Sequence, residues 1–136
     1  MLLKEIMQKN VVTVAPDCTI REAAKKMKDF RVGYLLVTNS ASIKGCVTDR
    51  DIVMWLAEGK NPEETRIGSV MQANVVTVSP ETDVFEASKI MAKNRIRRLP
   101  VVEDSRIAGI VSTADIASVL EEEVDNFLHV EEFYQL

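Results

Sequence analysis

The strongest constraint on the fold is an internal duplication. When the sequence is aligned with itself, Met7-Gln8 matches Met71-Gln72, and the register continues without a gap as far as Asp51-Ile52 and Asp115-Ile116. The offset is constant at about 64 residues, and roughly 20 of about 46 aligned positions are identical. Two copies are too few for a solenoid, so the duplication predicts a compact pseudo-twofold pair.

Each copy has the order strand, helix, strand, strand, helix. In the first copy, residues 11–14 form a β-branched run that ends before Pro16, and residues 20–30 have apolar side chains at helical spacing. Apolar runs at 34–38 and 43–48 flank a polar turn, and a helix follows from Asp51 to about Glu58. The predicted fold class is therefore α/β (α+β), with two βαββα units.

The duplication also sets the expected boundaries, which are residues 1–60 and 61–120 for the two units and 121–136 for a C-terminal helical tail. Between the copies, 58–66 contains Gly59, Asn61 and Pro62 without apolar periodicity and is expected to be a linker. The tail continues the last helix. It is acidic on one side and apolar through Phe127, Leu128 and Phe133.

Composition excludes several classes of protein. The 136 residues carry a formal net charge of -4, which opposes general attraction to nucleic acid or to an anionic membrane. With no leader-like or membrane-spanning apolar run, a cytoplasmic location is expected. Cys18 and Cys46 are expected to be buried thiols, and the single His129 argues against a His/Cys metal site. Neither a catalytic set nor a required cofactor is expected, so the chain is predicted not to be an enzyme.

The third strand of each copy ends in a hydroxyl residue and a carboxylate three positions apart, Thr48 with Asp51 and Ser112 with Asp115. One interpretation is a capping box at the start of the following helix. The other is a ligand site, in which the helix start attracts phosphate and the carboxylate accepts hydrogen bonds from a ribose diol. The two interpretations are compatible. Gly45 and Gly109, just before these pairs, would allow close backbone approach.

Three doubled motifs carry a family resemblance. These are the Val-Val-Thr-Val-x-Pro opening, a second strand that reads Arg-Arg-Leu-Pro-Val-Val at 97–102, and the Gly-x-Val-Ser/Thr-x-x-Asp close. From about Leu3 to Leu120 the sequence resembles a tandem pair of CBS domains, the Bateman module.

The resemblance implies two units packed sheet to sheet with two clefts between them. In that family the clefts bind AMP, ADP, ATP or S-adenosylmethionine, so the chain is expected to be a regulatory module that senses an adenine nucleotide or adenosyl compound. The implied ligand-binding residues are Thr48, Asp51, Asn74, Val75 and Val76 for one cleft, and Asn10, Val11, Val12, Ser112, Asp115, Arg97 and Arg98 for the other.

The first copy departs from the pattern where Gly33 and Tyr34 replace Arg97 and Arg98, and Arg50 partly compensates beside Asp51. The two clefts are therefore not expected to be equivalent. The resemblance further implies a homodimer and an effector protein of unknown identity. Two alternatives remain open from the sequence: a structural or protein-interaction module without a nucleotide ligand, and nucleic-acid binding through the arginines of the second copy.

Overall fold

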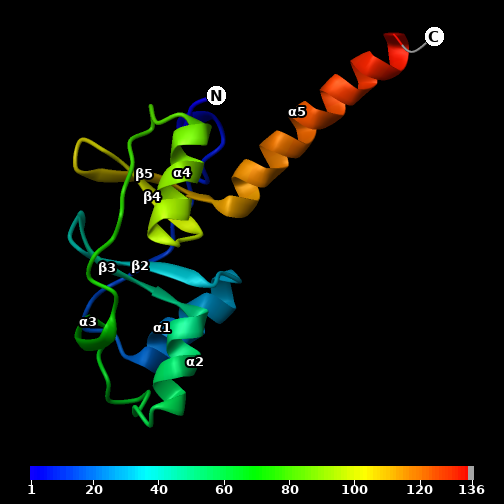
Figure 1. Ribbon diagram of the computed structural model, residues 1–136. Helices are drawn as coiled ribbons and strands as arrows, with labels where there is room; N and C mark the ends of the chain where they lie inside the picture. The colour runs from blue at the N-terminus through cyan, green and yellow to red at the C-terminus, as the bar shows by residue number, and fades with distance from the viewer. Residues whose placement is uncertain (135–136) are drawn as a thin grey trace. The chain divides into compact units, whose positions relative to one another are not determined.

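The computed structural model describes the backbone of residues 1–134 and the side chains of residues 1–132. Figure 1 shows the course of the chain. The elements are η1 (Leu3–Glu5), β1 (Thr13–Val14), α1 (Ile20–Phe30), β2 (Tyr34–Asn39), β3 (Ser42–Thr48), α2 (Asp49–Ala57), α3 (Ile67–Val70), α4 (Val84–Asn94), β4 (Arg98–Glu103), β5 (Arg106–Ser112) and α5 (Thr113–Tyr134). The predicted order is confirmed in full for the first copy, and for the second copy from its first helix, α4, onward.

The chain forms two compact units whose segments alternate along the sequence. Unit 1 consists of Met1–Lys9, Thr77–Glu103 and Ala108–Leu136, and unit 2 of Asn10–Val76 and Asp104–Ile107. Each unit therefore contains the body of one repeat together with the segment that leads into the other repeat. Of the expected tail, residues 135–136 and the side chain of Phe133 lie outside the described residues.

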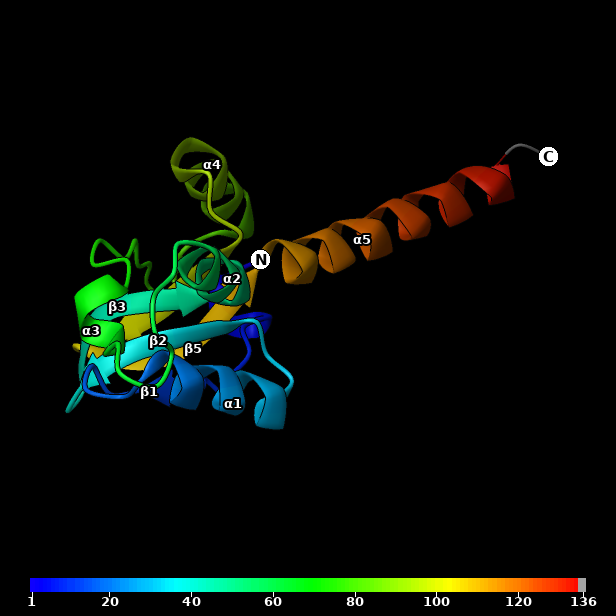
Figure 2. The same cartoon turned by 90° about the horizontal axis from the view of Figure 1, so that it is seen from below.

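Unit 2 is built on a sheet of order β1-β2-β3, in which β1 is parallel to β2 and β2 is antiparallel to β3. The helices α1 and α2 contact each other and the strands β2 and β3 respectively, and they cover one face of this sheet (Figure 2). Their apolar faces meet the strands in a core of buried residues: Val14, Ile20, Ala23, Met27, Leu35, Val37, Val47, Ile52, Trp55 and Ile67. Trp55 is thus a packing residue.

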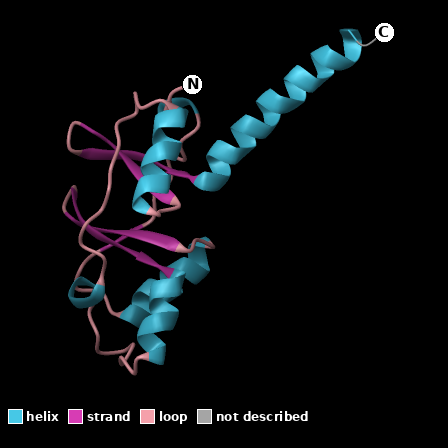
Figure 3. Cartoon of the chain, in the orientation of Figure 1, coloured by secondary structure: helices cyan, strands magenta, loops and turns pink. Residues whose placement is uncertain are grey.

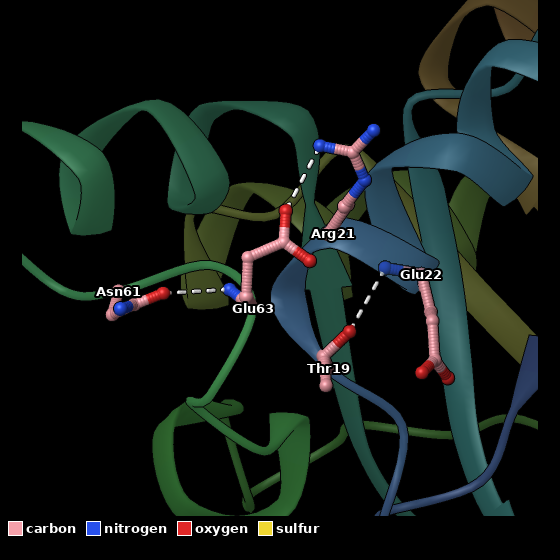
Figure 4. Close-up of polar contacts among 5 residues, drawn as sticks. All are labelled: Thr19, Arg21, Glu22, Asn61 and Glu63. Atoms are coloured by element: carbon pink, nitrogen blue, oxygen red, sulfur yellow. Dashed lines mark hydrogen bonds and ion pairs between the residues drawn. The ribbon is translucent and has the colours of Figure 1, made fainter.

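The start of α1 is tied to the predicted linker by local polar contacts, drawn in Figure 4. Thr19 is the N-cap, since its hydroxyl accepts a hydrogen bond of 3.2 Å from the Glu22 N–H. Arg21 forms an ion pair of 2.9 Å with Glu63, whose own N–H donates to the Asn61 side chain at 2.9 Å. The turn region after α2 is therefore an ordered part of unit 2, and it leads into α3, a short helix that the sequence did not predict.

Unit 1 contains the β4-β5 hairpin with α4 and α5 (Figure 3). The first strand of this repeat is reduced to a single parallel bridge between Val78 and Val101. The leading segment joins the unit through a 2.9 Å hydrogen bond from the Leu3 N–H to the Thr82 carbonyl, and the Leu3 side chain is fully buried. The other buried apolar residues of unit 1 include Val84, Ala87, Met91, Leu99, Val101, Val111 and Ile116.

Equivalent glycines lie where each leading segment meets a strand of its unit. In unit 2, Cys46 and Gln72 exchange backbone hydrogen bonds of 2.9 and 3.1 Å. A Cβ on Gly45 would stand 2.6 Å from the Gln72 carbonyl oxygen. In unit 1, Gln8 and Ile110 exchange bonds of 2.8 and 2.9 Å, and a Cβ on Gly109 would stand 2.8 Å from the Gln8 carbonyl oxygen. The close approach predicted at both glycines is confirmed.

Several expectations about individual residues were wrong. Phe30, placed on the apolar face of the first helix by its spacing, is 59% exposed at the end of α1. The first strand covers only Thr13–Val14, although the Val12 carbonyl just before it accepts a 3.2 Å bond from the Leu36 N–H of β2. The helix after β3 begins at Asp49, two residues before the predicted start, since Thr48 is its N-cap.

None of the helices within residues 1–134 combines the length and the apolar character needed to cross a membrane.

Gly45→Ala and Gly109→Ala are expected to destabilise the protein by about 1–3 kcal/mol each, because the added methyl group meets a backbone carbonyl that cannot move without breaking a bridge. Urea unfolding gives the free energy. Lys44→Ala, at the exposed neighbouring position of β3, is the control and should change it little. Stability equal to the wild type in both glycine variants would contradict the packing argument.

Candidate functional site

The two hydroxyl–carboxylate pairs have the same geometry. At the start of α2, the Thr48 N–H donates to Asp51 Oδ2 at 2.9 Å, and the Asp51 N–H donates to Thr48 Oγ1 at 3.1 Å. At the start of α5, the Ser112 N–H donates to Asp115 Oδ2 at 2.9 Å, and the Asp115 N–H donates to Ser112 Oγ at 3.1 Å. These are reciprocal capping boxes, which confirms the structural interpretation of both pairs.

A capping box does not use all the acceptor capacity of a carboxylate, which has two oxygens and about four lone-pair sites. The carboxylates of Asp51 and Asp115 are half-buried, so a ligand can still reach them. Among the described residues, no donor bonds to Oδ1 of Asp115. The hydrogen bond from the Ser112 N–H to Oδ2 holds the carboxylate in place, and Oδ1 can accept a bond from a ligand hydroxyl.

Asp51 differs from Asp115 because a second side chain approaches it. The Gln72 amide Nε2 donates to Asp51 Oδ1 at 3.1 Å and to Oδ2 at 3.2 Å. Gln72 reaches this position because its backbone is bridged to Cys46, close to the exit of β3. Its counterpart Gln8 makes the equivalent backbone bridge in unit 1, but within the described residues it donates no bond to Asp115. The two carboxylates are therefore not equivalent.

The sequence did not identify Gln72 as a functional residue. The Met-Gln pairs at 7–8 and 71–72 served only to fix the register of the repeat. A signal was nevertheless present, since both pairs lie in the segments that bridge to the strand just before the carboxylate of the same unit. That pairing depends on the tertiary fold and not on local sequence.

The other residues predicted for the first cleft belong to unit 2 with Asp51. Arg50 is exposed in the first turn of α2, and its N–H donates to Asp49 Oδ1 at 2.8 Å. Asn74 is exposed and Val75 and Val76 are half-buried in an extended segment that follows Gln72. Asn10, Val11 and Val12 also belong to unit 2. Their assignment to the site of Asp115, which is in unit 1, stays a prediction.

Arg97 and Arg98 lie in unit 1 with Ser112 and Asp115. Only Arg98 is in the strand, as the half-buried first residue of β4, whereas Arg97 is exposed in the preceding bend. The Arg97 carbonyl accepts a 3.0 Å bond from the Thr113 N–H, which ties the bend to the start of α5. Because Arg97 lies outside the strand, the alternation of side chains between the two faces of a strand does not determine how Arg97 and Arg98 are oriented relative to each other.

In the first copy, Asp49 lies beside Gly33, the position that Arg97 occupies in the second copy. The Asp49 N–H donates to the Gly33 carbonyl at 3.0 Å, matching the bond between Thr113 and Arg97. A Cβ on Gly33 would stand 2.7 Å from Asp49 Oδ2. In the observed conformation, the aspartate side chain occupies the space into which a larger residue at position 33 would extend.

The environment of the two thiols is unfavourable to the thiolate. Burial raises the pKa of Cys18 to about 11, and the nearby carboxylates of Glu22 and Asp17 act in the same direction. Burial also raises the pKa of Cys46, with a further contribution from the Asp51 charge and an opposing one from a hydrogen bond with Tyr34. Within the part of the chain that the structure describes, no three His, Cys, Asp or Glu side chains gather to form a metal site.

Comparisons of sequence and of structure with known proteins all point to the same family. The sequence model of the CBS domain matches residues 3–58 and, a second time, residues 67–122. The chain belongs to the CBS domain family. The CBS domain-containing protein YhcV of Bacillus subtilis is 37% identical over 115 residues, which cover 85% of this chain and 82% of YhcV.

Solved structures of CBS proteins have the same fold. The CBS domain pair of protein MJ0100, solved in complex with 5-methylthioadenosine and S-adenosylmethionine, superposes with a TM-score of 0.81 at 30% identity, covering 88% of this chain and 99% of that one. A hexameric CBS-CP12 protein from bloom-forming cyanobacteria gives a TM-score of 0.79 at 35% identity, covering 86% and 66% of the two chains. The mixed α/β fold with two CBS units is thereby established.

The raised pKa of Cys18 predicts slow alkylation. Near neutral pH, native Cys18 should react with iodoacetamide about a hundredfold more slowly than the same residue in urea-unfolded protein, because only the thiolate reacts. The native rate should rise about tenfold per pH unit up to a pH of about 11. Peptide mass spectrometry follows each cysteine separately. Equal native and unfolded rates at Cys18 would contradict the prediction.

Proposed function

We propose that this CBS pair is a regulatory module that binds an adenine nucleotide or adenosyl compound, of the class AMP, ADP, ATP or S-adenosylmethionine, at Asp115 and Asp51. The observation that carries the proposal is the repetition of one hydroxyl–carboxylate turn with the same hydrogen-bond lengths in both copies. The adenosyl ligands of the MJ0100 pair, a relative at 30% identity, support the choice of ligand class.

The chemistry of the turn suits a ribose. A diol offers two O–H donors, and a carboxylate that already accepts one backbone N–H can accept them on its outward lone pairs. Ser112 and Thr48 give the helix starts a hydroxyl beside the carboxylate, and the free N–H groups of the first turn favour a phosphate nearby. The bound state would keep the capping box, so the protein need not unfold a helix turn to take up its ligand.

The remaining residues complete the proposal within each unit. In unit 1, Arg98 at the start of β4 and Arg97 in the bend before it supply positive charge for the phosphates of a nucleotide. In unit 2, Arg50 is the corresponding charge, and the backbone of 74–76 offers hydrogen bonds to an adenine edge. The absence of an arginine at positions 33 and 34 makes unit 2 the poorer phosphate site.

Gln72 is a second reason to expect weaker ligand binding in unit 2 than in unit 1. Its amide already occupies both oxygens of Asp51, and a ribose must displace it before binding there. Asp115 has no such competitor among the described residues. We therefore assign the tighter site to Asp115.

Calorimetric titration with AMP, ADP, ATP, S-adenosylmethionine and adenosine tests the proposal directly. At least one of them should release or absorb heat, and Asp115→Ala should weaken the tighter binding event by about ten- to a hundredfold, the value of hydrogen bonds to a charged group. Absence of heat with every compound would contradict the proposal and favour a module that acts by protein interaction alone.

A matched control separates capping from binding. Ser112→Ala and Thr19→Ala each remove a helix N-cap and should each lower the free energy of unfolding by about 1 kcal/mol. Only Ser112→Ala should also weaken ligand binding, because Thr19 caps α1 and belongs to neither hydroxyl–carboxylate pair. A similar loss of affinity in both variants would mean that the effect comes from stability.

Removal of the competing amide should strengthen the weaker site. In an Asp115→Ala background, Gln72→Ala is expected to increase the residual affinity by about two- to tenfold, because no hydrogen bond to Asp51 must then be broken. Gln8→Ala in an Asp51→Ala background is the matched control and should leave the affinity unchanged. Weaker binding after Gln72→Ala would instead make Gln72 a ligand contact.

A further inference from the structure

The residues around the two capping carboxylates give the strand exits opposite charge. In unit 2 the matched positions are Gly33, Tyr34, Asp49, Arg50 and Asp51, so that two aspartates and one arginine leave a net charge of -1. In unit 1 they are Arg97, Arg98, Thr113, Ala114 and Asp115, so that two arginines and one aspartate leave +1. The exposed residues Arg31 and Arg95, two positions earlier, are the same in both copies and do not change this difference.

Backbone hydrogen bonds hold the matched positions together within each unit. The Asp49 N–H donates to the Gly33 carbonyl at 3.0 Å, and the Thr113 N–H donates to the Arg97 carbonyl at 3.0 Å. Asp49 and Thr113 each begin the helix whose first turn contains the capping carboxylate. The residues that differ between the copies therefore lie beside the proposed ribose acceptor in both units, and a charged ligand group next to the ribose meets a different field in each.

The negative charge of Asp49 is not neutralised by an internal partner. Its Oδ1 accepts the Arg50 N–H at 2.8 Å, and its Oδ2 lies 2.7 Å from the point where a Cβ on Gly33 would stand. Among the described residues, no lysine or arginine side chain, Arg50 included, forms an ion pair with Asp49. The carboxylate is exposed, so it can act on a ligand at this strand exit.

Tyr34 gives unit 2 an aromatic ring at the position of Arg98. In the register of β2 and β3, Tyr34 lies opposite Thr48, and its side chain forms a hydrogen bond with Cys46, two residues before Thr48 and on the same face of the strand. These contacts hold the ring against the end of β3, next to the hydroxyl of the capping pair. The negative face of an aromatic ring attracts a cation and offers nothing comparable to a phosphate.

We propose that the two sites select adenosine compounds of opposite charge at the 5′ position. The Asp115 site takes phosphorylated adenine nucleotides, and the Asp51 site takes an S-adenosyl sulfonium compound. The assignment rests on the proposed function and gives each unit its own ligand class. In unit 2, the Asp49 carboxylate and the Tyr34 ring attract the positive sulfur, whereas in unit 1 the two arginines attract phosphate.

The selectivity of the Asp51 site is separate from its lower affinity. Gln72 must be displaced from Asp51 by the ribose of any adenosine compound, and its amide is uncharged. It therefore weakens the binding of all these compounds alike and does not favour one charge over another. Asp49 and Tyr34 act on the 5′ substituent, so they change the order of affinities among ligands that share the same ribose and base.

Calorimetric titration of single-site variants tests the assignment. Asp115→Ala leaves the Asp51 site, which should bind S-adenosylmethionine about tenfold more tightly than AMP, and Asp51→Ala leaves the Asp115 site, which should show the reverse order. S-adenosylhomocysteine lacks only the methyl group and the positive charge of the sulfonium, and it should bind the Asp51 site about three- to tenfold more weakly than S-adenosylmethionine. The same order of affinities at both sites, or no binding at the Asp51 site, would overturn the assignment. Absence of heat from the wild type with every compound would contradict the proposed function itself.

Substitutions at the differing positions test which residues determine the order. In the Asp115→Ala background, Asp49→Asn should lower the ratio of S-adenosylmethionine affinity to AMP affinity about threefold, the value of one exposed charge. Tyr34→Arg introduces the residue of unit 1 and should lower the same ratio about tenfold. Glu64→Gln removes an exposed carboxylate of unit 2 outside the strand exit and is the matched control, with no change expected. An unchanged ratio in both Asp49→Asn and Tyr34→Arg, or an equal change in Glu64→Gln, would overturn the roles of Asp49 and Tyr34.

Discussion

The close backbone approach at Gly45 and Gly109 is the contact on which the rest of the structure depends. At each glycine, the segment that leads into one repeat forms a pair of backbone hydrogen bonds with a strand of the other repeat, and even a methyl side chain would collide with the incoming carbonyl. Because the contact is made by two carbonyl–amide pairs, it fixes the position of the leading segment relative to the strand. It therefore also fixes which side chains stand beside the strand exit, and this is how Gln72 reaches Asp51.

The capping box at each strand exit is compatible with the proposed binding role of its carboxylate. A capping box orients the carboxylate through a backbone N–H and uses only part of its acceptor capacity. The repeated bond lengths in the two copies indicate that the turn is determined locally by the hydroxyl, the carboxylate and the strand-to-helix geometry. What differs between the copies is set by side chains that arrive from elsewhere.

Local patterns predicted most of the fold. Helical spacing gave α1 at its observed bounds and the continuation of α5 beyond Ile116, and the hydroxyl–carboxylate spacing gave both capping boxes. Long-range features were missed. Neither the alternation of the two units along the chain nor the bond from Gln72 to Asp51 has a local signal, and Phe30 has helical spacing but falls in the last turn of α1, where it is exposed.

The two copies differ in the side-chain contacts around the strand exit. Asp49 lies beside Gly33 in the first copy, and the Gln72 amide bonds to the Asp51 carboxylate, whereas the identical Gln8 makes no such bond to Asp115 within the described residues. In the second copy Thr113 stands at the position of Asp49, and no described residue donates to Oδ1 of Asp115. Asp115 also lies in the first turn of α5, whose 22 residues form one continuous helix. A displacement of this first turn would therefore be carried along the helix to its exposed end.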